Sequence, residues 1–349
     1  MKTTLFICTV FVFLFSWSLV MADNRDEPAP KDWNQAMRTV RYPSPVDHSL
    51  QPAVIYVPES KEPVPLLVTL HTWSGDYQQP ASSRATWCIE KHWALIAPNF
   101  RGPNNTPQGC GSELAVADIV AAVEYMKKRT KIDTNRIYLI GASGGGYGSL
   151  LLAGRHPEIW AGVSAWVGIT DLKDWHSETS AKKLPYANHL EKACGGIPGA
   201  SPDVDEQYRL RSANTWIQNA AGIPLDINHG IHDGHTGSVP VSHSIKAFNL
   251  LAEPDKKINE KDILYFRTER KVPETLRKET EPDPLFRGMP VLFRRISGNT
   301  RLTIFDGGHQ SSEQSALHWL SLQQKGKKPE WNISPISNTG EIQIKNVEK

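Results

Sequence analysis

A Gly-x-Ser-x-Gly motif occupies residues 141–145 and centres on Ser143. It follows an apolar run, 137–140, and precedes a stretch, 149–154, that predicts a helix. A serine at such a strand-to-helix turn lies in a strained backbone conformation with its hydroxyl exposed. The motif makes Ser143 a candidate nucleophile, although a glycine-rich loop between a strand and a helix is the structural alternative. Because a serine hydroxyl is a weak nucleophile near neutral pH, this chemistry also requires a base and an acid.

Two later loops supply candidates for these partners. Asp233 follows a predicted strand at 223–228. His309 follows another, at 301–305, in a glycine-rich loop before a predicted helix. Asp226 competes as the acid, but it lies inside its predicted strand, whereas sites in parallel sheets form beyond the carboxyl ends of the strands. The sequence therefore predicts Asp233 as the acid and His309 as the base.

Attack of a nucleophile on a carbonyl creates an oxyanion, which backbone N–H groups stabilise. One predicted donor is the N–H of Gly144, directly after the nucleophile. The second donor is expected from the small-residue loop 71–75, either from Thr72 or from Trp73. Because these are backbone roles, the side chains of these residues carry little information about them.

Four ring-bearing side chains are candidates for the substrate pocket. Trp166 and Trp175 lie near the ends of predicted strands, where an indole face could stack on a sugar ring. The alternative for each tryptophan is a place in the hydrophobic core. His232 and His235 share the loop of Asp233 and are expected to line the pocket or to form local hydrogen bonds.

Apolar runs and amphipathic stretches alternate along most of the chain. Strands are predicted at 53–58, 65–71, 93–98, 137–140, 161–167, 223–228 and 301–305, and helices at 83–91, 113–129, 241–251 and 310–322. This alternation predicts an α/β fold with one mostly parallel, twisted sheet covered by helices on both faces. The expected domain covers residues 35–325, with a cap-like insertion at about 175–208, a charged insertion at about 253–290 and a polar tail at 326–349.

These motifs resemble the catalytic domain of the prolyl oligopeptidase family of serine hydrolases, which has the α/β hydrolase fold. The resemblance rests on the motif at 141–148, on His-Gly-x-x-Asp at 229–233 followed by Val-Pro at 239–240, and on Gly-Gly-His at 307–309. It implies that the nucleophile, the acid and the base follow one another in this order along the chain. The chain departs from the family pattern at 234–238, because five residues rather than two separate the acid from Val-Pro.

Oligopeptidases of this family carry a large N-terminal propeller that admits only small peptides. Here residues 23–52 alone separate a predicted signal peptide from the first predicted strand, which favours an open domain similar to stand-alone secreted esterases. The expected function is a secreted serine hydrolase that cleaves carboxylic esters, of small molecules or of carbohydrates, through an acyl-enzyme intermediate. A serine peptidase of the same family is the alternative, for which Glu178 and Glu191 are the only candidate acidic anchors. A non-catalytic binding protein on the same fold is a third hypothesis. Neither a cofactor nor a metal site is predicted.

Composition and the N-terminal segment limit which binding partners and which cellular location are expected. The 349 residues include 39 Lys and Arg against 37 Asp and Glu, so the net charge of +2 gives no electrostatic reason to expect nucleic acid as a partner. Residues 1–22 have a basic start, an apolar run and small residues before Ala22, which predict a cleaved signal peptide. A secreted or periplasmic protein without stable membrane insertion is expected, with an uncleaved anchor as the alternative. Residues 23–34 are predicted to form a flexible leader. The oligomeric state is left open.

Three cysteines, Cys88, Cys110 and Cys194, follow the predicted signal peptide. An exported protein meets an oxidising compartment, so a disulfide is expected to be stable there. Proximity along the chain makes a bridge between Cys88 and Cys110 the first hypothesis, and three buried free thiols are the alternative.

Overall fold

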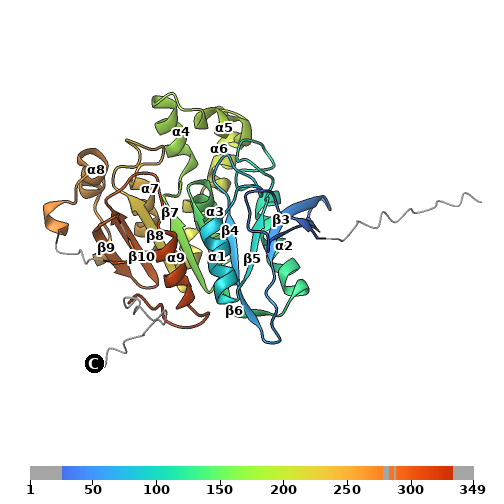
Figure 1. Cartoon of the computed structure of the whole chain (residues 1–349). Helices are drawn as coiled ribbons and strands as arrows, with labels where there is room; N and C mark the ends of the chain where they lie inside the picture. Colours follow the sequence, from blue (N-terminus) through green and yellow to red (C-terminus); the bar gives the residue numbers. More distant parts are fainter. Residues whose placement is uncertain (1–25, 278–282, 287, 333–349) are drawn as a thin grey trace, which may run out of the picture.

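A single mixed sheet runs through the domain in the computed structural model, which describes residues 26–277, 283–286 and 288–332 (Figure 1). Its strands are β1 (Glu27–Pro28), β2 (Arg38–Pro43), β3 (Leu50–Tyr56), β4 (Val64–Leu70), β5 (Ala94–Pro98), β6 (Ile132–Ala142), β7 (Gly162–Trp166), β8 (Leu225–Gly230), β9 (Val291–Ser297) and β10 (Thr300–Phe305). Their order across the sheet is β1-β2-β3-β5-β4-β6-β7-β8-β10-β9.

The centre of the sheet is parallel and its two edges are antiparallel. From β5 through β4, β6, β7 and β8 to β10, every neighbouring pair is parallel. Strands β1 to β3 add an antiparallel edge on one side, and β9 adds one on the other. Every residue of β4 is buried, as expected for an apolar strand that is covered on both faces. The predicted mostly parallel α/β sheet is confirmed.

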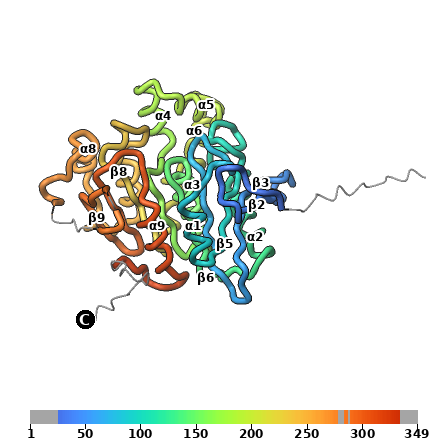
Figure 2. Tube along the Cα trace, in the orientation of Figure 1, coloured from blue at the N-terminus to red at the C-terminus, as the bar shows by residue number. Residues whose placement is uncertain are grey.

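Helices cover both faces of this sheet. They are α1 (Ser82–Lys91), α2 (Glu113–Arg129), α3 (Gly144–Arg155), α4 (Leu172–Ala181), α5 (Tyr186–Cys194), α6 (Pro202–Arg211), α7 (Ser242–Leu251), α8 (Glu260–Glu269) and α9 (Glu313–Ser321), with short 3-10 turns at Ala213–Thr215, Ile217–Gly222, Pro254–Lys256 and Glu274–Leu276. Alternate residues of β4 point to opposite faces, so Leu66 and Val68 join one hydrophobic cluster while Leu67 joins the other. The first cluster includes residues of α2, α3 and α7, and the second includes residues of α1 and α9. Helices α1 and α9, far apart in the sequence, lie side by side (Figure 2).

The insertion predicted at 175–208 is helical. Helices α4, α5 and α6 lie together at the top of the molecule in Figure 1, next to the carboxyl ends of the parallel strands. Each has a local reason to form. Asp171 and Ser201 accept hydrogen bonds from the first-turn N–H groups of α4 and α6, and Gly195 ends α5 in the left-handed conformation.

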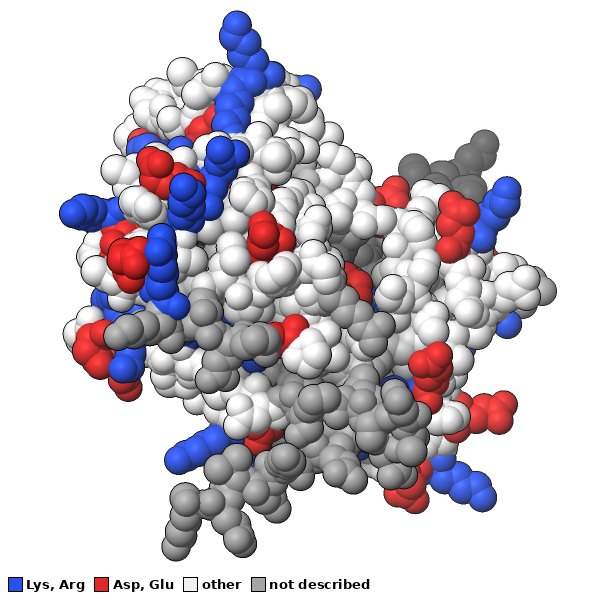
Figure 3. Space-filling view, turned by 60° about the vertical axis from the view of Figure 1, so that its left-hand side comes forward, with Lys and Arg blue, Asp and Glu red and all other residues white. Residues whose placement is uncertain are grey.

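The charged insertion at 253–290 packs on the domain through a few apolar side chains. Ile263 and Phe266 of α8 are buried, whereas the intervening Leu264 and Tyr265 are exposed. In Figure 3 acidic and basic side chains alternate on the left-hand side of the view, as the near-zero net charge leads one to expect. In the described part of the chain, no helix is both long and apolar enough to cross a bilayer.

Three expectations from the sequence need correction at the margins of the domain. The sequence patterns did not identify β2 or β9, which lie in the antiparallel margins of the sheet and have exposed polar residues. Residues 26–34 do not behave as a free leader, because Glu27–Pro28 pairs with β2 and Trp33 is buried against the second cluster. The start of the predicted polar tail also packs, since the ring of Trp331 stacks on Trp319 with centroids 5.4 Å apart. The predicted signal peptide lies outside the described residues.

The hypothesis of a bridge between Cys88 and Cys110 is wrong in this structure. All three cysteines are free and buried. Cys88 belongs to the hydrophobic cluster of α1, whereas Cys110 belongs to the cluster on the opposite face of the sheet, so the sheet separates the two sulfurs. Burial raises the pKa of each thiol, to about 11 for Cys194, which keeps all three protonated near neutral pH.

Candidate active site

The carboxyl ends of the central parallel strands gather the candidate residues at one edge of the sheet. Ser143 follows β6, Asp233 follows β8, and His309 follows β10. The loop with Thr72 and Trp73 follows β4, which pairs directly with β6. The connections of a parallel sheet thus bring together loops that are far apart in the sequence.

Ser143 occupies the sharp turn expected of a nucleophile. Its backbone has φ 58° and ψ −120°, a conformation that costs a non-glycine residue free energy and that is stored at functional sites. The N–H of Ser143 donates to the carbonyl of Trp166 in the neighbouring strand at 2.9 Å, and α3 begins at the next residue. The turn is therefore anchored on both sides, and the serine side chain remains half-buried at the edge of the sheet.

Asp233 and His309 form a directly hydrogen-bonded pair. His309 Nδ1 lies 2.6 Å from Asp233 Oδ2. The other carboxylate oxygen, Oδ1, accepts hydrogen bonds from the N–H groups of Gly234 at 2.8 Å and of Val239 at 3.2 Å. Asp233 is 1% exposed, so all of these bonds form away from water. Two backbone donors thereby fix the carboxylate so that Oδ2 faces the imidazole.

The unusually long loop after the acid covers this pair. A Cβ atom on Gly237 would lie 2.2 Å from Asp233 Oδ1 and 2.7 Å from the Cβ of His309. Only glycine allows the backbone to approach both side chains so closely. The insertion at 234–238 therefore folds over the acid and the base rather than away from them.

His229 is a second histidine on the acid, and the sequence patterns did not distinguish it from its neighbours. Its Nε2 lies 3.3 Å from Asp233 Oδ2 and 3.0 Å from the carbonyl oxygen of Val239. Its Nδ1 lies 2.7 Å from the hydroxyl of Ser244 on α7. Two acceptors at Nε2 favour a proton on that nitrogen. The sequence feature that could have indicated this role is the position of His229 near the end of an apolar strand, because a polar side chain buried there requires hydrogen-bond partners.

These partners control the charge of Asp233. Burial by itself would raise the pKa of the carboxyl, but hydrogen bonds and charges from His229 and His309 outweigh burial and hold the pKa below its usual range. Asp233 is therefore ionised at any pH at which a histidine titrates.

The competing acid has a structural role. Asp226 is completely buried within β8, and its Oδ1 accepts a hydrogen bond from Arg301 Nε at 2.7 Å. Its other oxygen accepts from the side-chain amide of Asn228 at 2.8 Å. It pairs with no histidine, so the structure favours Asp233 over Asp226 for contact with His309.

The structure distinguishes between Thr72 and Trp73, the two candidate oxyanion donors in the loop after β4. The N–H of Thr72 already donates to Gln79 Oε1 at 3.1 Å, and the Thr72 hydroxyl donates to the same atom at 2.8 Å. The N–H of Trp73 donates to none of the described residues. A Cβ on Gly144 would lie 2.3 Å from the Trp73 nitrogen, so the two backbones touch beside Ser143. The expectation for Thr72 is corrected, and Trp73 is the available partner of Gly144. Gln79, which holds the loop, was not anticipated.

The two tryptophans predicted for the pocket are buried, which corrects that prediction. Trp166 is 0% exposed and packs between Phe286 and Phe305, on the α1 side of the sheet. Trp175 is 1% exposed, and its indole packs edge-on against Trp73 with centroids 4.6 Å apart. Neither can offer a face to a sugar, but Trp175 joins the cap to the loop after β4.

The two histidines predicted for the pocket form local contacts instead. His232 Nε2 lies 2.9 Å from Asp306 Oδ1 and faces a separate cleft beside α8. His235 is exposed, and its Nε2 lies 2.6 Å from the carbonyl oxygen of Arg267. The second of the two roles expected for them, local hydrogen bonding, is the one observed.

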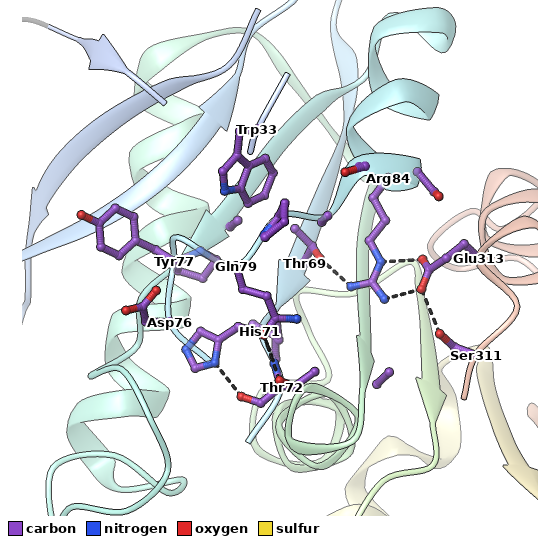
Figure 4. Close-up of a pocket in the computed structure, with 18 residues that line it drawn as sticks. Trp33, Thr69, His71, Thr72, Asp76, Tyr77, Gln79, Arg84, Ser311 and Glu313 are labelled. Atoms are coloured by element: carbon purple, nitrogen blue, oxygen red, sulfur yellow. Dashed lines mark hydrogen bonds and ion pairs between the residues drawn. The ribbon is translucent and has the colours of Figure 1, made fainter. Parts of the chain in front are cut away.

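A pocket of about 300 Å³ opens between the loop after β4 and the loop that carries His309 (Figure 4). It is lined by Ala142, which precedes Ser143, and by residues of both loops. Ser143 and His309, both described, are not joined by a hydrogen bond in this structure, as is common for catalytic groups in unliganded proteins. A hydroxyl, an oriented imidazole and two neighbouring backbone N–H groups are together suited to nucleophilic acyl transfer.

Part of the chain is similar to known serine hydrolases. Residues 111–270, which include Ser143 and Asp233, match the prolyl oligopeptidase family. The uncharacterised protein YfhR of Escherichia coli K12 is 27% identical over 176 residues, or 50% of this chain and 53% of that protein. Dipeptidyl-peptidase 5 of Porphyromonas gingivalis is 32% identical over 106 residues, 28% of this chain and 15% of that protein. Feruloyl esterase B of Thermothelomyces thermophilus is 26% identical over 127 residues, 33% of this chain and 43% of that protein. The aligned part thus spans about half, or less, of each relative.

Solved structures agree on the fold. A puromycin-hydrolysing peptidase of Mycobacterium tuberculosis superimposes with a TM-score of 0.51 at 19% sequence identity, over 62% of this chain and 34% of that chain. At 19% sequence identity, this similarity shows the fold but does not indicate the substrate. The chain thus has the α/β hydrolase fold, and its residues 111–270 match the prolyl oligopeptidase family.

Proposed function

We propose that this protein is a secreted hydrolase of carboxylic esters, with Ser143 as nucleophile, His309 as base and Asp233 as the acid that orients the base. The observation that carries the proposal is the strained turn at Ser143 beside the 2.6 Å bond between Asp233 and His309. His309 takes the proton of Ser143 as its oxygen attacks the ester carbonyl. The N–H groups of Gly144 and Trp73 stabilise the oxyanion. The alcohol leaves with the proton from His309. A water molecule then attacks the acyl-enzyme while His309 takes its proton, and His309 returns that proton to Ser143 as the acid product leaves.

The cap supports an ester rather than a peptide as substrate. A peptidase that removes N-terminal residues requires a free carboxylate for the substrate amine. Glu178 is engaged by His243 at 3.0 Å and by Arg267 at 3.1 Å, and Glu191 is engaged by His176 at 2.9 Å. The similarity to a feruloyl esterase supports the same choice, and the similarity to a dipeptidyl-peptidase supports the alternative of a serine peptidase.

Turnover of an ester and of an amide by the same preparation tests the proposal. We expect p-nitrophenyl acetate to be hydrolysed faster than alanyl-p-nitroanilide, with kcat/KM measured for both from release of the chromophore. Faster turnover of the anilide would overturn the proposal in favour of a peptidase. Turnover of neither would overturn it in favour of a binding protein.

Activity is expected to rise with pH, because only the neutral imidazole of His309 can accept the serine proton. Histidine side chains change charge between about pH 5 and 8, so kcat/KM should rise across this range. The low pKa of Asp233 keeps its carboxylate ionised throughout, so protonation of Asp233 does not contribute to the loss of activity on acidification. The measurement is a pH profile with p-nitrophenyl acetate, corrected for spontaneous hydrolysis. A flat profile over this range would contradict the role of His309.

A further inference from the structure

We propose that the pocket of about 300 Å³ beside Ser143 binds the alcohol portion of the ester, and that this portion is a neutral sugar or polyol. This inference rests on the proposed ester hydrolase function and names its substrate class. The volume is at the lower end of the range of small-molecule sites and suits one sugar unit rather than a polymer.

The position of the pocket assigns it to the alcohol rather than to the acyl group. Its wall includes Thr72 of the oxyanion loop, Ala142 directly before the nucleophile, and Ser311, two residues after the base. The leaving alcohol takes its proton from the histidine, so it must lie on the histidine side of the reacting carbonyl. The cavity extends from Thr72 to Ser311 and is therefore on that side, next to Ser143 and His309 although neither of them lines it.

Three polar groups on the pocket wall have no hydrogen-bond partner among the described residues. They are the Gln79 amide nitrogen, the Oδ2 oxygen of Asp76 and the Tyr77 hydroxyl, and all three side chains are half-buried. Gln79 lies in the middle of the view in Figure 4, where its Oε1 accepts from Thr72 and so fixes the amide. One donor, one acceptor and one group that is both match the hydroxyls of a polyol.

Arg84 and Glu313, two of the charged residues of the pocket, neutralise each other. Arg84 donates to Glu313 through Nε at 2.6 Å and through Nη2 at 2.8 Å, and its Nη1 donates to the Thr69 hydroxyl at 2.7 Å. The Ser311 hydroxyl donates to Glu313 at 3.0 Å. Three of the five N–H donors of Arg84 are thus engaged and Glu313 balances its charge, while the charge of Asp76 opposes an anion. A neutral alcohol is the ligand that this wall accommodates.

Two aromatic side chains complete the site. Trp33 and Tyr77 line the pocket, and the Trp33 indole is held by a hydrogen bond from Nε1 to the Gln78 carbonyl oxygen at 3.1 Å. Trp33 is only 6% exposed, so its indole contributes an apolar edge to the wall, and the half-buried ring of Tyr77 is the aromatic surface left for the C–H face of a sugar.

Filling the pocket tests the proposal. Ala81 lines the pocket at the start of α1 and is half-buried, and Thr86 is exposed on the same helix outside it. We expect Ala81→Phe to lower kcat/KM for a monoacetylated methyl xyloside about tenfold more than for p-nitrophenyl acetate, which has the same acyl group. Methyl xyloside should inhibit the wild type competitively and inhibit Ala81→Phe less. Thr86→Phe should leave both rates unchanged.

A smaller substitution tests the same pocket if Ala81→Phe fails to fold. Tyr77→Phe removes only a hydroxyl and should also lower kcat/KM more for the xyloside ester than for the aryl ester. Equal losses on both esters in both variants would overturn the proposal. The proposal would also be overturned if the wild type preferred an alanyl ester to the xyloside ester and Asp76→Asn abolished that preference, because this result would identify a site for an amine. A change in preference between acetyl and butanoyl esters of one alcohol would reassign the pocket to the acyl group. Absence of wild-type activity on p-nitrophenyl acetate would instead contradict the ester hydrolase function itself.

Discussion

Replacement of Ser143 by alanine is expected to lower kcat for ester hydrolysis by about 10⁶-fold, the loss typical of removing the nucleophile of a serine hydrolase. The oxyanion donors and the pocket remain in the variant, so ester binding should persist while acylation is lost. Labelling by a fluorophosphonate probe should disappear as well, because the probe reacts with the activated serine. The measurements are turnover of p-nitrophenyl acetate and in-gel fluorescence after labelling.

The matched control is Ser180→Ala, since Ser180 is exposed on α4 and distant in sequence from the loops of the site. This variant should retain wild-type labelling and turnover. Undiminished labelling of Ser143→Ala would exclude Ser143 as the nucleophile. The thermal unfolding temperature of Ser143→Ala should not fall, because the strained turn at φ 58° is no more costly for alanine than for serine.

Replacement of Asp233 by asparagine is expected to lower kcat by about 10⁴-fold with little change in KM. The direction of the amide follows from the structure. Oδ1 accepts from the N–H groups of Gly234 and Val239, so the amide oxygen must take that place and its NH₂ group must face His309. An NH₂ group there requires an unprotonated Nδ1 and so places the imidazole proton on Nε2, where the base must accept the proton of Ser143. The variant thus loses its base, and His229 keeps only the Val239 carbonyl oxygen as an acceptor at Nε2.

Asp306→Asn is the control for this effect. Asp306 lies three residues before His309 on the same loop, and it contacts His232 rather than His309. Its replacement should leave kcat within about twofold of wild type, as is usual for surface substitutions. If Asp233→Asn retained most of the wild-type kcat, or if both variants lost activity equally, Asp233 would not be the acid of the site.

The structure also explains why some roles escaped recognition in the sequence. Gln79 reaches Thr72 only because residues 73–78 turn back on themselves, and although Ser74, Gly75 and Asp76 signal a turn, they do not show that the side chain of Gln79 returns to Thr72. Trp33 meets α1 and β5 from a segment whose composition predicts a flexible leader. The pocket walls come from five separate parts of the chain, so their meeting depends on contacts between segments that no local pattern records.

Residue patterns alone predicted the parallel α/β sheet and placed Ser143, Asp233 and His309 after three of its strands. They could do so because a strand buried on both faces must be apolar throughout, and because loops after parallel strands share one edge of the sheet. Which side chains touch one another became known from the three-dimensional arrangement. It assigned Asp226 to Arg301, set His229 against Asp233, engaged the N–H of Thr72 and left that of Trp73 available, and buried the two tryptophans expected in the pocket. The hydrogen bonds and the burial of these residues depend on segments that are distant in the sequence. The type of a residue alone therefore determines neither its hydrogen-bond partner nor its exposure.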